Sequence, residues 1–339
     1  MDYVRFGNTG MKVSQLCLGA MGFGDNTSGF NEWSLSEADS RPVIKKALDL
    51  GINFFDTANV YSYGDSERIL GKALNDYANR DEIVVASKVF VSMKKNKNQT
   101  NFSGFGGKVA NDGGLSRKEI MFQIDQTLER MGMDYLDLYI IHRWDYNTPI
   151  EETMEALHDV VKSGKVRYIG ASAMYTWQFA KANHVAEKNG WTKFVSMQNH
   201  LNLLYREEER EMLPYCDDAK IAVTPYSPLA SGRLTRDWTA QTKRFLTDQT
   251  GNSKYDSTME QDKIIVERVA EIAEKYDVKR AQVALAWLLQ KESVVAPIIG
   301  ATKESHLLDA MPALDLKLSA EDVHYLEEMY LPHKVVGAL

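Results

Sequence analysis

Residues 54–61 read Phe54-Phe55-Asp56-Thr57-Ala58-Asn59-Val60-Tyr61, an apolar run that passes directly into an acid and, five residues later, a phenol. Two later segments repeat this arrangement. Lys88 follows the apolar run 83–87, and His142 follows the apolar run 136–141. Each of these four side chains therefore lies at or just past the end of an expected strand, which is where a (β/α)8 barrel places its catalytic groups. We expect all four to meet at one barrel mouth.

Short apolar runs alternate with helical patterns along the whole chain, which predicts a parallel sheet with crossover helices. Eight strand–helix units in about 320 residues suit a closed (β/α)8 TIM barrel better than an open sheet. The expected strands cover 16–18, 52–55, 83–86, 136–141, 166–169, 194–197, 221–224 and 295–299. The expected helices cover 37–50, 66–79, 117–131, 150–163, 176–189, 207–215, 281–291 and 303–311.

Several segments depart from this alternation. Residues 3–6 and 11–14 flank Gly7-Asn8-Thr9-Gly10 and predict an N-terminal β-hairpin. Long polar loops are expected at 91–115, after the third strand, and at 230–258, after the seventh; loops of this length are usually lids, binding loops or disordered segments. One helix is expected near 260–276 and another after residue 317. Because no repeat or low-complexity linker divides the chain, we interpret residues 1–339 as a single α/β barrel domain.

The overall composition narrows the class of protein. The formal net charge is −7, from 40 basic and 47 acidic residues, so no global basic field favours nucleic acid. The two cysteines, Cys17 and Cys216, have neither metal nor redox spacing, and no histidine cluster predicts a metal site. No stretch approaches the roughly 18 apolar residues that a membrane helix requires, and the first residues lack a signal-peptide core. We therefore expect a cytoplasmic enzyme without metal, membrane or nucleic-acid partners.

The four side chains at the expected barrel mouth suit proton transfer to a carbonyl. A carbonyl that accepts hydride develops alkoxide character and needs a proton donor. Tyr61 is the natural donor, with Lys88 lowering its pKa from about 10 by stabilising the phenolate. Asp56 would keep Lys88 charged and oriented, and His142 would hydrogen-bond the carbonyl oxygen. Tyr63 is a second phenol nearby, which we rank below Tyr61.

Taken alone, each of the four has an ordinary structural explanation: a turn residue, a half-buried aromatic, a solvated amine and a satisfied polar group. Their occurrence at three successive strand ends favours a site, because charged groups are rarely left near a barrel mouth without partners. A hydrolase is disfavoured, since Gly170-Ala171-Ser172-Ala173-Met174 begins like the nucleophile motif G-x-S-x-G but ends in methionine.

These motifs carry a resemblance to a known family. They are Asp56 to Tyr61 with Gly64 and Ser66-Glu67, Lys88 within Ala86-Ser87-Lys88-Val89, and His142 after Tyr139-Ile140-Ile141. In order and spacing they match the catalytic tetrad of the aldo-keto reductases, and the chain is similar to the aryl-alcohol dehydrogenase-like branch over nearly its whole length. The resemblance implies reduction of aldehydes, and of some ketones, by direct hydride transfer. It also implies NADPH as the favoured cofactor, with NADH as an alternative.

The sequence contains neither a G-x-G-x-x-G motif nor a P-loop, so a dinucleotide needs another cradle. By resemblance, the carboxamide of the nicotinamide meets Ser172 and Gln198, and its ring stacks on Tyr226. The same resemblance assigns cofactor contacts to Ala20, Met21, Ser227, Pro228, Leu229, Gly232, Arg233, Gly300, Thr302, Lys303, His306 and Asp309. The chain departs from the family at Ala173, where asparagine is frequent, and at His306 and Ala310, which weakens the assignments there.

A non-catalytic alternative stays open at this point. The β subunits of voltage-gated potassium channels share the fold and bind the cofactor but act as regulatory partners. They typically have asparagine at the position of His142, so the intact tetrad favours an enzyme. Trp33 and Trp144 are candidate walls of the substrate pocket, with ordinary packing as the alternative. The sequence predicts neither the small carbonyl substrate nor the oligomeric state.

Overall fold

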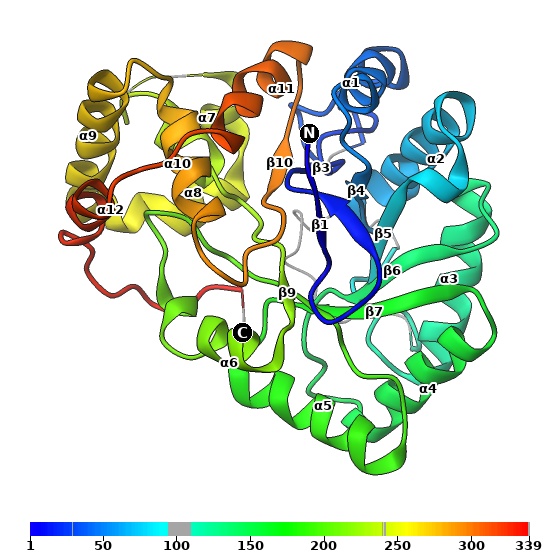
Figure 1. Ribbon diagram of the computed structural model, residues 1–339. Coiled ribbons are helices and arrows are strands. Elements are labelled where there is room, and N and C mark those ends of the chain that lie inside the picture. Colours follow the sequence, from blue (N-terminus) through cyan, green and yellow to red (C-terminus); the bar gives the residue numbers. More distant parts are fainter. Residues whose placement is uncertain (29, 94–109, 239, 241, 338–339) are drawn as a thin grey trace.

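A computed structural model describes residues 1–28, 30–93, 110–238, 240 and 242–337 of the chain. Eight parallel strands pair in the order β10-β3-β4-β5-β6-β7-β8-β9. Backbone hydrogen bonds between Val223 and residues Ser293 and Val295, each 2.9 Å, join the two ends of this sheet. Helices surround the strands (Figure 1). The expected (β/α)8 barrel is therefore confirmed.

The strands are short, and most lie within one to three residues of their expected positions. The barrel strands are β3 (Cys17–Gly19), β4 (Phe54–Asp56), β5 (Val84–Val89), β6 (Leu136–Ile141), β7 (Val166–Ser172), β8 (Ser196–Gln198), β9 (Ala222–Val223) and β10 (Ile298–Gly300). The helices are α1 (Glu37–Asp49), α2 (Asp65–Tyr77), α3 (Arg117–Met131), α4 (Ile150–Lys162), α5 (Thr176–Asn189), α6 (Met212–Ala219), α9 (Met259–Lys275), α10 (Arg280–Leu289), α11 (Glu304–Ala310) and α12 (Ala320–Glu327).

Side chains alternate between two cores along the barrel strands, as the pleat requires. One set points outward against the helices. The other fills the barrel and includes Cys17, Phe54 and Leu138, all fully buried. These apolar side chains fill the part of the barrel away from the carboxyl ends of the strands. The polar groups of the site therefore lie at the carboxyl ends.

The predicted hairpin closes the other end of the barrel. Strands β1 (Tyr3–Arg5) and β2 (Lys12–Ser14) pair antiparallel, and the hairpin lies across the strands inside the ring of helices (Figure 1). Phe6, fully buried, meets Phe54 edge-to-face at 5.7 Å. Gly7 has a positive φ of 56°, and a Cβ there would come within 2.8 Å of the Lys220 carbonyl oxygen, so the turn needs glycine.

Two expectations require correction. Residues 207–215 were expected as one helix, but Glu207–Glu209 form a 3-10 turn and α6 begins only at Met212. The segment 230–258 was expected as a loop, yet it contains a 3-10 segment Ala230–Thr235 and two short helices, α7 (Lys243–Thr247) and α8 (Gln249–Tyr255). Most of the other expected loop, residues 94–109, lies outside the described residues. Among the helices that are described, none is long and apolar enough to cross a membrane.

Candidate active site

The four predicted side chains meet at the carboxyl ends of β4, β5 and β6. Lys88, fully buried, donates from Nζ to a carboxylate oxygen of Asp56, to the Thr57 carbonyl at 2.8 Å and to the Tyr61 hydroxyl at 3.4 Å. The Tyr61 and His142 rings lie edge-to-face with centroids 5.8 Å apart. The ammonium of Lys88 is thus the link between the acid and the phenol.

A tight turn places Tyr61 in this position. Its backbone N–H donates to the Ala58 carbonyl at 3.1 Å, and Ser62, Tyr63 and Gly64 then follow with positive φ values of 46°, 54° and 92°. For Ser62 and Tyr63 such backbone conformations cost free energy and persist where the surrounding structure holds them, whereas Gly64 adopts its conformation freely. Here α2 begins directly after the turn.

Electrostatics within the site fix the protonation states. Burial lowers the pKa of Lys88, but Asp56 and Tyr61 raise it by more, so the ammonium stays charged. Burial raises the pKa of Tyr61, and this outweighs the lowering by Lys88, so the net shift is upward. Lys88 lowers the Tyr61 pKa as expected, but burial raises it by more, because burial removes the water that would solvate a phenolate.

His142 is held as a neutral imidazole. Burial lowers its pKa well below the usual value, and the nearby cations Lys88, Arg143 and Lys254 lower it further. A neutral ring has one N–H donor, which suits a hydrogen bond to a carbonyl oxygen. The geometry therefore combines a buried phenol, a charged ammonium and a neutral donor around one point.

A large cavity opens above these groups, with a volume of about 1590 Å³. Sites for one small ligand are typically about 300–1,000 Å³, so this one has room for two molecules. Asp56, Tyr61 and His142 line it, and so do most of the residues assigned by resemblance: Met21, Trp33, Ser172, Gln198, Tyr226, Ser227, Pro228, Leu229, Gly232, Gly300, Thr302, Lys303, His306 and Asp309.

Four assigned residues do not line the cavity. Lys88 lies beneath it, and Ala20 is buried with its carbonyl accepting from the Ser66 hydroxyl. Arg233 was expected along the pyrophosphate, but its guanidinium donates to Asp256 at 2.6 Å. Trp144 was expected in the pocket wall, but its ring packs against Trp177 with centroids 6.0 Å apart. The structure thus gives no support to side-chain roles for these residues in binding.

The sequence is similar to known proteins over nearly its whole length. The Aldo/keto reductase family matches residues 15–331. The chain belongs to the aldo-keto reductase family. It is 45% identical to a Schizosaccharomyces pombe protein with the provisional name aryl-alcohol dehydrogenase C977.14c, over 99% of this chain and 98% of that protein. It is 42% identical to versiconal hemiacetal acetate reductase of Aspergillus parasiticus, with the same coverage. The predicted family and branch are confirmed, and the chain is an oxidoreductase of a family that uses nicotinamide cofactors on small carbonyl compounds.

Features of this aldo-keto reductase fit such a cofactor. The Ser172 hydroxyl is buried at the cavity wall and, within the described residues, has no hydrogen-bond partner, as expected of a group that awaits a carboxamide. Ser227, Ala230, Ser231 and Gly232 all have positive φ, so the chain beside Tyr226 forms a strained, turning loop along the cavity. Gln198 donates to Asp56 Oδ2 at 2.9 Å, so it also holds the Asp56 carboxylate in place.

Several cavity residues escaped the sequence analysis. Arg143 follows His142 directly, and Lys254 comes from α8. The C-terminal residues Val336 and Gly337 also line the cavity. Arg143 was adjacent to a predicted catalytic residue, which was the one available signal. Lys254 had none, because the sequence did not predict α8.

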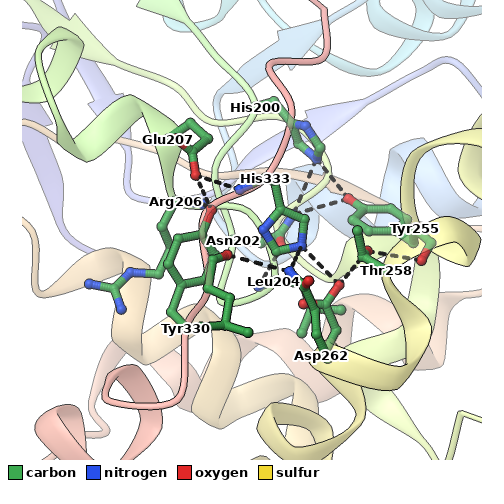
Figure 2. A network of polar contacts seen from close by, with 12 residues as sticks. His200, Asn202, Leu204, Arg206, Glu207, Tyr255, Thr258, Asp262, Tyr330 and His333 are labelled. Carbon is green, nitrogen blue, oxygen red and sulfur yellow. Dashed lines mark hydrogen bonds and ion pairs between the residues drawn. The ribbon is translucent and has the colours of Figure 1, made fainter.

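The C-terminal tail is fixed by a polar network (Figure 2). His333 lies 3.0 Å from an Asp262 carboxylate oxygen, and its backbone N–H donates to Glu207 at 2.8 Å. Glu207 also accepts from the Tyr330 hydroxyl at 2.7 Å. Asp262 outweighs the effect of burial and raises the pKa of His333. These contacts hold the tail in place between α12 and the cavity.

A column of stacked rings connects the tail to the cavity wall. His200 stacks on Tyr205 with centroids 4.2 Å apart and on Tyr226 at 5.2 Å. The Tyr205 hydroxyl accepts from the Val336 N–H at 3.1 Å. His200 also contacts the Tyr255 hydroxyl at 2.7 Å (Figure 2). The plane of Tyr226 is therefore set by rings that the tail helps to hold.

Proposed function

We propose that this aldo-keto reductase reduces aldehydes, and some ketones, to alcohols with NADPH as the favoured cofactor and Tyr61 as the general acid. The observation that carries the proposal is the Lys88 ammonium, buried beneath the cavity and hydrogen-bonded to both Asp56 and Tyr61. Buried ion pairs add little net stability, so an apolar side chain would serve the fold equally well at this position. The presence of an ammonium here therefore points to a chemical role.

The chain's own residues divide the work. Tyr61 gives its proton to the developing alkoxide, and Lys88 stabilises the phenolate that results. Asp56 keeps Lys88 charged and in place. His142, as a neutral donor, orients the carbonyl oxygen and stabilises negative charge on it. Because the Tyr61 pKa is raised in the free protein, the phenol is fully protonated at neutral pH and ready to donate.

A reduced nicotinamide dinucleotide, when bound, supplies the hydride. Ser172 and Gln198 would hold its carboxamide, and Tyr226 would flank its ring. The loop 227–232 and the segment 300–303 would hold the phosphates, with Lys303 favouring the extra phosphate of NADPH. The C-terminal tail and the loops 91–115 and 230–258 would set the substrate range. The buried, free thiols of Cys17 and Cys216 agree with the proposed cytoplasmic location.

Replacing Tyr61→Phe tests the proposal. The change removes the proton donor and keeps the ring that packs on Phe30 at 6.1 Å. General acid catalysis contributes about 10²–10⁴-fold, so we expect kcat with NADPH and benzaldehyde to fall by roughly that factor while NADPH binding persists. Tyr63→Phe, the same change two residues on, is the matched control and should leave turnover intact.

Undiminished turnover in Tyr61→Phe would show that the proton comes from elsewhere. If the wild-type protein binds NADPH tightly but oxidises it with no member of a broad carbonyl panel, the regulatory-subunit alternative takes its place. If it binds neither NADPH nor NADH, the cofactor assignment itself is wrong.

A further inference from the structure

Two cations line the cavity, and neither belongs to the catalytic tetrad or to the expected phosphate contacts. Arg143 follows β6, and Lys254 projects from α8; both line the cavity. The Lys254 ammonium lies 4.7 Å from the centroid of the Tyr226 ring. The Arg143 guanidinium donates to the His142 carbonyl at 2.8 Å.

Both cations lie beside groups of the site, because Arg143 bonds to the His142 backbone and Lys254 lies over the Tyr226 ring. Lys254 and Arg143 each lower the pKa of His142, and Arg143 also lowers the pKa of Tyr61. The expected phosphate contacts lie elsewhere, in the loop 227–232 and the segment 300–303. An anion held by Arg143 and Lys254 would therefore lie near the carbonyl that is reduced.

Within the described part of the chain, neither cation forms an ion pair with a carboxylate. Arg143 donates to a backbone carbonyl, and the Lys254 ammonium lies over the ring of Tyr226. Asp248 is the acid whose charge acts on Lys254, but burial and Arg143 outweigh it and lower the pKa of Lys254 to about 7. The two cations repel each other, and an anionic ligand bound between them would relieve that repulsion.

We propose that this cavity takes a carbonyl substrate that carries a carboxylate, held by Lys254 and Arg143 while Tyr61 and His142 engage the carbonyl oxygen. This inference rests on the proposed reductase function and adds the substrate class. The carboxylate forms charge-assisted hydrogen bonds with both cations, and one of these alone contributes on the order of tenfold or more in affinity.

The test compares 4-formylbenzoate with its methyl ester, which differ in the one charge. Wild-type protein, Lys254→Met and the control Lys188→Met are assayed with NADPH. Lys188 is an exposed lysine at the end of α5, so its replacement makes the same charge change outside the cavity. Arg143 is left intact because its bond to the His142 backbone would confound the result.

We expect wild-type protein to favour the carboxylate in kcat/KM by on the order of 10- to 100-fold. Lys254→Met should lose most of this preference, and Lys188→Met should keep it. Equal turnover of acid and ester by the wild type overturns the inference while leaving the reductase function standing. A loss in Lys254→Met that is the same for both aldehydes, together with weaker NADPH binding, also overturns it and assigns Lys254 to the coenzyme phosphates.

A binding measurement separates this inference from the proposed function. Calorimetric titration of the NADP⁺-loaded protein with each aldehyde reports affinity without turnover. Tighter binding of 4-formylbenzoate than of the ester, lost in Lys254→Met, supports the anion site even if neither aldehyde is reduced. No difference in binding, in protein that also fails to reduce either aldehyde, refutes both proposals.

Discussion

The buried pair of Lys88 and Asp56 allows the stabilising and chemical roles of the site to be separated. Lys88→Met keeps an unbranched side chain of similar length but leaves the Asp56 carboxylate, 2% exposed, without its cation. Removing one partner of a buried ion pair costs about 3–5 kcal/mol. We expect that loss in the free energy of unfolding, together with loss of reductase activity.

The double variant Lys88→Met/Asp56→Asn removes both charges. The amide at position 56 can still accept the hydrogen bond that Gln198 now donates to Asp56. Replacing both partners by neutral groups is often close to neutral for stability, so we expect most of the lost free energy to return. Activity should not return, because Tyr61 still lacks its ammonium neighbour. The interaction energy of the cycle should be about 2 kcal/mol or more.

Urea unfolding followed by tryptophan fluorescence at pH 7 measures both changes, with the free energy taken from the midpoint and the slope m. Wild type and Asp56→Asn complete the cycle, and NADPH oxidation is followed in parallel. If the double variant is as unstable as Lys88→Met, an isolated buried carboxylate is not the cause of the loss. If the double variant is active, Lys88 is not the group that assists Tyr61.

Three further outcomes are expected. The pKa of His333 is raised in the folded protein. Its contact with Asp262 is therefore fully stabilising below the unfolded pKa of about 6.5 and is lost as the pH rises through the higher native pKa. The difference in urea midpoint between wild type and His333→Gln should shrink over that range. Lys254 has a pKa of about 7, so the preference for 4-formylbenzoate over its ester should fall as the pH rises above 7. The Lys254→Arg variant stays charged, so the same fall in that variant would contradict the prediction. Trp33→Ala should raise KM for an aromatic aldehyde, whereas Trp144→Ala should not, as steady-state kinetics will show.

The tetrad could be predicted from sequence because each member is tied to a strand end. Asp56 is the last residue of β4, Lys88 lies within β5, and His142 directly follows β6. Strand ends are marked by local apolar runs, and the barrel brings the carboxyl ends of its strands together whatever the loops do. The direction of the Tyr61 pKa shift was not predictable, because it depends on how completely the surrounding loops bury the phenol.

The helix α8 was not predictable for a different reason. Gln249–Tyr255 contains glycine and mostly polar residues, without the apolar period of an amphipathic helix. Asp248 caps it by accepting from the Gly251 N–H at 2.9 Å. Arg233, distant in sequence, holds it by donating to Asn252 at 3.1 Å. Tertiary contacts of this kind override local propensity, and with α8 the sequence analysis also missed Lys254.

Met1 and Gly337 lie on opposite faces of the barrel, and this has a practical consequence for handling the protein. Met1 lies against Gly51, beside the hairpin that closes the barrel. Gly337 lies against Tyr226, where a Cβ would come within 2.7 Å of the phenol oxygen. A purification tag or surface linker at the N-terminus therefore leaves the cavity open to reactants. The same attachment placed after Gly337 would start at the cavity wall beside Tyr226, crowding the space that reactants occupy.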